Sequence, residues 1–134
     1  GVNVAERARE TEGPARRQSF DDVRALGVGA RRMVKAAVGA YGDDDAEAAR
    51  GVLAADDEID DRYHSLTQSM FELVAAQPDE VRSAIGVMKA AKYLERVADH
   101  ATNIAEEVIF IVTGQDVRRP RRGNSNGGGK PTPR

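Results

Sequence analysis

The chain has no cysteine and no tryptophan, and it holds only three phenylalanines and three tyrosines among its 134 residues. The lack of cysteine excludes disulfide bonds, thiolate metal ligands and cysteine nucleophiles. The scarcity of aromatic rings predicts an aliphatic core and argues against the stacking platforms that bind single-stranded nucleic acid. No apolar run approaches the ~20 residues that a membrane-spanning helix needs. The sequence therefore predicts a protein that does not itself cross a membrane.

The net charge of −2 conceals three segments of different sign. Residues 1–20 carry four arginines against three glutamates. Residues 21–117 carry ten lysines and arginines against nineteen acids, a net charge of −9, whereas residues 118–134 carry six basic residues and no acid. An acidic body repels nucleic acid and attracts cations. We therefore expect no nucleic-acid partner.

The two ends differ in composition from the body. Residues 1–18 are polar and are interrupted by Gly13 and Pro14, which predicts a flexible linker without the apolar stretch of a secretory signal. The missing initiator methionine suggests a fragment or a processed chain, and we expect a cytoplasmic location. Residues 117–134 predict a disordered basic tail, which either keeps the chain in solution or contacts anionic lipid. A folded domain is predicted over residues 19–116.

Three helical patterns fill this domain. The first begins at Ser19, which forms a near capping box with Asp22, and stops at Gly42. The second covers about 46–76 after an aspartate run, residues 43–45, that supplies its N-cap. The third follows Pro78, covers about 79–113 and ends at Gly114.

Apolar residues recur every three or four positions in each helix, which is typical of a buried helical face. In the first helix they are Val23, Leu26, Ala30, Val34, Ala37, Val38 and Tyr41. The seam of the second contains one acid and reads Val52, Asp56, Ile59, Tyr63, Leu66, Met70 and Leu73. The third has Ala84, Val87, Ala91, Leu94, Ala98, Ala101, Ala105, Val108 and Val112. Because the connections are short, we predict an all-α fold, an antiparallel three-helix bundle.

Acidic and amide side chains share one stripe of the third helix next to its apolar seam. They are Glu95, Asp99, Asn103 and Glu106, with Thr102 at the edge of the stripe. Glu95 and Asp99 are one turn apart, where like charges repel, and partial burial makes both carboxylates harder to ionise. A bound cation would remove both penalties.

The second helix carries a matching pair, Asp56 and Asp60, that faces Glu95 and Asp99 if the two helices are antiparallel. Oxygen ligands of this kind suit hard cations such as Mg²⁺, Mn²⁺ or Fe³⁺. The spacing alone also fits a solvated face in which Glu95 pairs with Lys92 or Arg96. Asp61 and His64 match half of a di-iron carboxylate motif, but Val97 stands where the second half needs a glutamate.

The segment 93–116, YLERVADHATNIAEEVIFIVTGQD, closely resembles the signature helix of PhoU-family phosphate-signalling proteins, through its ER-x-x-DH-x-x-NI-x-E core. The pair Asp56 and Asp60 is similar to the acidic motif that the family carries on its penultimate helix. The resemblance covers roughly residues 20–117. The family is built from two three-helix repeats, and this chain is long enough for one, matching the second. It is therefore either a fragment or one half of a homodimer.

The resemblance implies a non-enzymatic regulator that represses the phosphate-starvation response by linking a phosphate ABC transporter to a membrane sensor histidine kinase. It also implies metal binding, in some members as multinuclear iron clusters. Association with the membrane would then be peripheral and through these partners. Carried over by position, the metal ligands are Asp56, Asp60, Glu95, Asp99, Asn103 and Glu106, and Arg96 pairs with a neighbouring acid. Two alternatives stay open, a helical adaptor without metal and a carboxylate-bridged metal enzyme.

Overall fold

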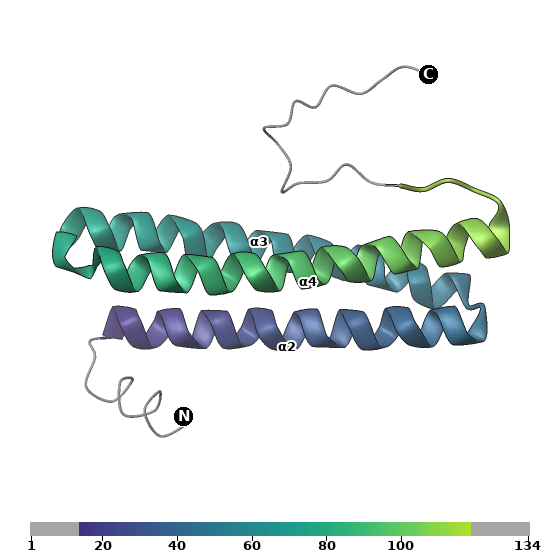
Figure 1. Ribbon diagram of the computed structural model, residues 1–134, viewed down its shortest axis with the longest axis horizontal. Coiled ribbons are helices and arrows are strands. Elements are labelled where there is room, and N and C mark those ends of the chain that lie inside the picture. Colours follow the sequence, from purple (N-terminus) through teal and green to yellow (C-terminus); the bar gives the residue numbers. More distant parts are fainter. Residues whose placement is uncertain (1–13, 119–134) are drawn as a thin grey trace, which may run out of the picture.

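The computed structural model describes residues 14–118, which form three long antiparallel helices lying side by side (Figure 1). They are α2 (Pro14–Asp43), α3 (Ala46–Ala76) and α4 (Val81–Thr113), and a short 3₁₀ turn, η1 (Pro78–Glu80), joins the last two. Each helix packs against the other two, and residues 14–118 contain no strand. The predicted all-α three-helix bundle is confirmed. The remainder of the predicted linker and tail, residues 1–13 and 119–134, lies outside the described part of the chain.

The first helix begins five residues earlier than predicted, at Pro14 instead of Ser19. Proline suits the first turn of a helix, and the following residues 15–18 are alanine, two arginines and glutamine, which are good helix formers. Ser19 is therefore a buried residue inside α2, where its hydroxyl donates a weak hydrogen bond to the sulfur of Met70 over 3.9 Å. Arg16 forms an ion pair with Glu80 at 3.1 Å, so part of the predicted linker belongs to the bundle.

The turn between α2 and α3 also differs from the prediction that Gly42 would stop the first helix. The helix continues through Gly42 to Asp43, and Asp44 takes the left-handed conformation with φ of 52°. The amide of Asp45 then donates to the carbonyl of Ala40 at 2.9 Å, as in a Schellman motif. Asp45 caps α3 as expected, because its carboxylate accepts from the amide of Ala48 at 3.0 Å.

The end of α4 is as predicted. Gly114 has φ of 77° and donates its amide to the carbonyl of Phe110 at 2.8 Å. Only glycine adopts this backbone conformation without strain. Beyond it, Val117 packs partly against the core, although it was expected to begin the tail.

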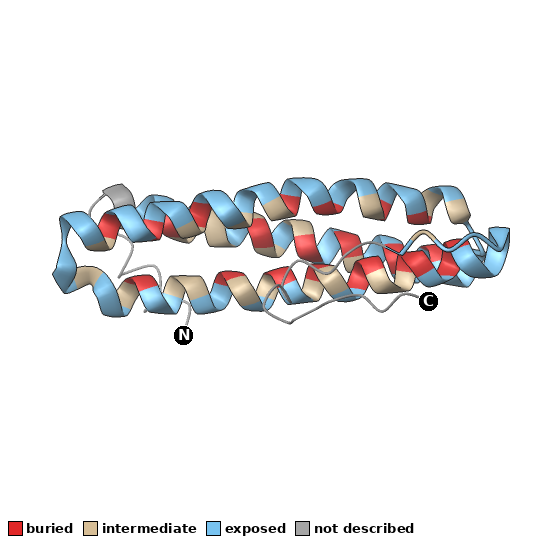
Figure 2. Ribbon diagram, turned by 90° about the horizontal axis from the view of Figure 1, so that it is seen from above, coloured by how far each residue is buried: buried red, intermediate tan, exposed pale blue. Residues whose placement is uncertain are grey.

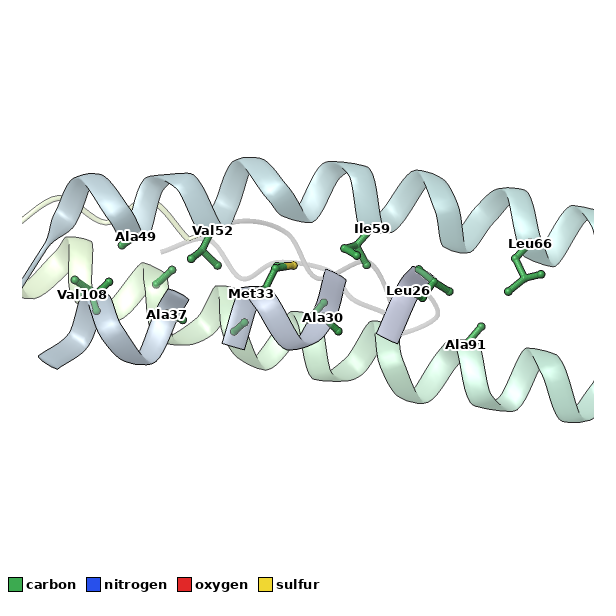
Figure 3. Close-up of a cluster of buried hydrophobic side chains, with 14 of the residues drawn as sticks. Leu26, Ala30, Met33, Ala37, Ala49, Val52, Ile59, Leu66, Ala91 and Val108 are labelled. Atoms are coloured by element: carbon green, nitrogen blue, oxygen red, sulfur yellow. The ribbon is translucent and has the colours of Figure 1, made fainter. Parts of the chain in front are cut away.

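Buried residues line the inner faces of the three helices, and the outer faces are exposed (Figure 2). The core is aliphatic, and half of its members are alanines, which allow the helices to approach closely; Figure 3 shows Leu26, Ile59 and Leu66 among the side chains between them. In α3 the predicted seam is buried, with Tyr63 partly so. Two positions predicted for α2 are wrong, because Val38 and Tyr41 are more than half exposed and Met33 and Ala40 are buried instead.

In α4 the predicted Val112 is 43% exposed in the last turn, and Ile109 is fully buried in its place. The other predicted positions of α4 are buried or packed against the core. None of the helices in residues 14–118 is long and apolar enough to span a membrane.

Candidate functional site

Three carboxylates of α3 and α4 are buried. Asp56 and Glu106 are each 7% exposed, and Glu95 is 4% exposed. Asp60, Asp99 and Asn103 are partly buried. We call these six residues the acidic face. Because a buried carboxylate loses hydration, each of them needs a compensating partner.

The short hairpin at η1 sets the register of the acidic face. Asp56 lies twenty residues before the end of α3 and Asp99 eighteen after the start of α4, which is about 30 and 27 Å from the hairpin at 1.5 Å per residue. Asp60 and Glu95 lie sixteen and fourteen residues away, or about 24 and 21 Å. The two aspartates of α3 therefore stand level with the two acids of α4, as the spacing predicts.

Lys92 occupies the hairpin side of the acidic face. Its ammonium lies 3.2 Å from the Glu95 carboxylate and 5.6 Å from the centroid of the Tyr63 ring. The contact with Tyr63 joins α4 to α3, and an ammonium over an aromatic ring is an attractive cation–π pair. The most deeply buried carboxylate of the face is thus neutralised by a cation from its own helix.

Asp60 has a basic neighbour as well. The Nε2 atom of His64 lies 3.4 Å from its carboxylate, one turn along α3. The His64 ring packs at a tilt on Tyr63, with centroids 5.5 Å apart. His64 is mostly exposed, so its contact with Asp60 contributes little to stability.

The other end of the acidic face opens into a small groove. A hollow of about 280 Å³ is lined by Asn103, Glu106, Glu107, Phe110, Asp116 and Arg118. The backbone amide of Arg118 donates to the Asp116 carboxylate at 3.1 Å, and the guanidinium lies 3.1 Å from its second oxygen. These hydrogen bonds from Arg118 lower the pKa of Asp116. Asp116 therefore adds a stable negative charge beside Asn103 and Glu106.

The donor chemistry of the acidic face suits a hard cation, since every donor is a carboxylate or amide oxygen and three of the carboxylates are buried. The side chains are nevertheless not gathered into a site. Within residues 14–118, no group of three or more carboxylate and imidazole side chains is arranged to hold a metal ion. The predicted residues are thus spread along α3 and α4, with Lys92 beside Glu95 and His64 beside Asp60.

Several residues of this region were not among the predicted ligands. Tyr63 was assigned only to the apolar seam, but its ring also contacts the Lys92 ammonium and the His64 ring. Asp116 and Arg118 lie after the helix, where no periodicity indicates which way a side chain points. Thr102, noted at the edge of the stripe, donates its hydroxyl to the Asp99 carbonyl at 2.7 Å, which satisfies a polar group in a buried position.

Comparison with known proteins gives the family of this chain. The family model described as "PhoU domain" matches residues 23–108. The phosphate-specific transport system accessory protein PhoU homologue of Pseudomonas putida is 35% identical over 101 residues, which cover 75% of this chain and 40% of the relative. The homologue of Pseudomonas aeruginosa is 34% identical over 75% of this chain and 42% of the relative.

The homologue of Zymomonas mobilis is 36% identical over 91 residues, or 68% of this chain and 38% of the relative. The aligned part of this chain thus spans about two fifths of these relatives. No solved structure matches the chain. Because the family model covers most of the bundle and the relatives share about a third of their aligned residues with it, this chain belongs to the PhoU family.

Proposed function

We propose that the chain is a metal-binding, non-enzymatic regulator of phosphate uptake and of phosphate-starvation signalling. The observation that carries the proposal is the row of buried carboxylates along α3 and α4 in a chain of the PhoU family. Its relatives are named as accessory proteins of a phosphate-specific transport system. Asp56, Glu95 and Glu106 supply buried carboxylate oxygens, which are ligands that hard cations prefer.

The proposed ligands are the residues of the acidic face, in which Asp56 is level with Asp99 and Asp60 with Glu95. A bound Mg²⁺, Mn²⁺ or iron ion, single or in a cluster, would supply positive charge that offsets the repulsion between these neighbouring carboxylates. To bind the ion, the Glu95 carboxylate would give up its contact with Lys92, and the Asp60 carboxylate would give up its contact with His64. Binding would then tie α3 to α4 and make their outer surface more rigid.

Regulation would proceed through protein contacts, with a subunit of a phosphate ABC transporter and with a sensor histidine kinase on the cytoplasmic side of the membrane. Exposed apolar side chains support a contact surface near the hairpin, because Phe71 is 58% exposed and Val81 and Ile85 are each 44% exposed. Association with the membrane would be peripheral, through these partners. We further propose that the chain forms a homodimer, to which the same exposed apolar side chains could contribute.

A second candidate is a helical adaptor that makes the same contacts without metal. It is favoured by the pairing of Lys92 with Glu95 at 3.2 Å and by the lack of a gathered ligand set among residues 14–118. In this case the acidic face is a set of internal ion pairs. The two candidates differ in their response to metal and share the regulatory role.

The regulatory role can be tested in a bacterium that lacks its own PhoU protein and carries a reporter for the phosphate-starvation response. The proposal predicts that this chain lowers reporter expression at high phosphate, and that Phe71→Ser or Ile85→Asp abolishes the effect while leaving the helical content unchanged. Unchanged reporter expression, with the chain present at normal levels, would contradict the proposed role.

A further inference from the structure

A groove along the contact between α2 and α3 carries three arginines and an apolar floor. It has a volume of about 560 Å³, and its lining includes Arg24, Val28, Arg32, Glu58, Ile59 and Arg62. Its α3 residues are not those of the acidic face. We propose that this groove binds an organic phosphate of about nucleotide size, with the phosphoryl group held by Arg24, Arg32 and Arg62.

The helical register brings the three arginines together. Arg24, Val28 and Arg32 are each four residues apart, so they follow one side of α2. Val28 lies fifteen residues before the end of α2 and Arg62 sixteen after the start of α3, which is about 22 and 24 Å from the turn that joins them. Arg62 is therefore level with Val28, and Arg24 and Arg32 flank it at about 6 Å along the helix axis.

Two of these guanidinium groups are available to a ligand. Arg24 and Arg32 are exposed, and neither has an ion pair or hydrogen bond with another residue of the 14–118 segment. Among the described residues, Arg62 is paired only with Glu58, at 3.3 Å, and both of these side chains are about half exposed or more. An exposed pair of this kind contributes little to stability, so a bound anion can displace Glu58 from Arg62.

The charge and shape of the groove indicate the class of ligand. Guanidinium groups bind phosphate oxygens through two parallel hydrogen bonds. Asp21 and Glu58 also line the groove, and their negative charges oppose the binding of an anion. We therefore expect a ligand with a single negative charge to bind weakly there. The volume falls within the range of ~300–1,000 Å³ that is typical of small-molecule sites and far exceeds a single phosphate ion. Val28, Gly29 and Ile59 offer an apolar surface for the body of the ligand.

The test is a titration of the full chain with a fluorescent adenosine diphosphate, and separately with inorganic phosphate, at low salt. We expect saturable binding of the nucleotide, weakened at least about tenfold by Arg24→Gln combined with Arg32→Gln. Arg31→Gln is the matched control, because Arg31 is an exposed arginine of α2 that does not line the groove, and its effect is expected to stay within twofold. Glu58→Gln is expected to tighten binding by releasing Arg62.

Three results would overturn the proposal. They are no nucleotide binding at millimolar concentration, equal loss of affinity in the Arg31→Gln control, and inorganic phosphate binding as tightly as the nucleotide. An acidic peptide that binds in the absence of any nucleotide binding would assign the arginines to a protein partner instead. None of these results depends on metal at the acidic face, so this site and the proposed metal regulation can fail separately.

Discussion

The ammonium of Lys92 lies 3.2 Å from the buried carboxylate of Glu95 and sits over the Tyr63 ring of the neighbouring helix. Lys92 thus neutralises an acid of its own helix and also links α4 to α3. Glu95 is 4% exposed, so its charge has little access to water. The Lys92–Glu95 pair therefore affects both the stability of the bundle and the proposed binding of metal by Glu95.

Replacing Lys92 with methionine is expected to destabilise the chain in the absence of metal. The substitution keeps the length of the side chain but leaves the Glu95 carboxylate without the Lys92 ammonium, at a cost of about 1–2 kcal/mol because Lys92 is partly exposed. The melting temperature should fall by about 5–10 °C in a bundle of this size. Thermal denaturation followed by circular dichroism measures this.

The control is Lys89→Met, which removes an exposed lysine of the same helix and should change stability by less than about 0.5 kcal/mol. Adding Glu95→Gln to Lys92→Met should restore most of the lost stability, since the buried charge is then absent. Equal melting temperatures for Lys92→Met and Lys89→Met would show that the pair contributes nothing.

Gly29 allows α2 to approach α3 closely. A Cβ atom at this position would overlap the Cδ1 atom of Ile59, which is buried. Gly29→Ala is therefore expected to cost about 1–3 kcal/mol through overpacking, although alanine is the better helix former. Urea denaturation measures the change.

Gly39→Ala is the matched control in the same helix, because nothing lies within 4 Å of the added Cβ atom. There the gain in helix propensity should stabilise the chain by about 0.5–1 kcal/mol. Ile59→Val removes the overlapping methyl group and should reduce the penalty of Gly29→Ala. Stabilisation by both glycine substitutions would contradict the close contact.

The turn between α2 and α3 predicts opposite effects for two neighbouring aspartates. Asp45→Ala removes the N-cap of α3 and should cost about 1 kcal/mol. Asp44→Gly should be neutral or stabilising, because Asp44 has φ of 52° and glycine adopts that conformation without strain. Measuring the unfolding free energies of the two variants tests both predictions. A stabilising effect of Asp45→Ala would contradict the role of Asp45 as the N-cap.

Most of the fold follows from the sequence because the signals are periodic. The seam of α3, with Asp56 inside it, and the alanine stripe of α4 repeat at helical spacing over many turns. The errors lie at the helix ends, where one or two residues determine the position at which a helix begins or stops. Pro14 begins α2 although it was assigned to a linker, and Asp44 takes the left-handed position that a glycine was expected to occupy.

For the candidate site, the sequence predicts which positions of α3 and α4 carry the carboxylates and not which contacts their side chains make. The spacing of Asp56, Asp60, Glu95 and Asp99 predicts that they stand level across the helix pair. Spacing does not determine which rotamers the side chains adopt, so Lys92 over Tyr63 could be anticipated only in part. The groove between α2 and α3 is not predictable from the sequence, because its arginines lie on exposed positions of two helices and the pattern of one helix does not indicate what faces it on the other.

Calorimetric titration of the metal-free chain with Mn²⁺ is the decisive test of metal binding by the acidic face. We expect saturable binding that is lost in the Asp56→Asn/Glu95→Gln variant and retained in Asp61→Asn/Glu72→Gln, which neutralises two exposed acids of α3. At one hundred times the dissociation constant, the metal should stabilise the wild-type chain by about 2.7 kcal/mol and leave the first variant unchanged. Absence of binding at millimolar Mn²⁺, Mg²⁺ and iron, or equal binding by both variants, would contradict the claim and leave the adaptor without metal.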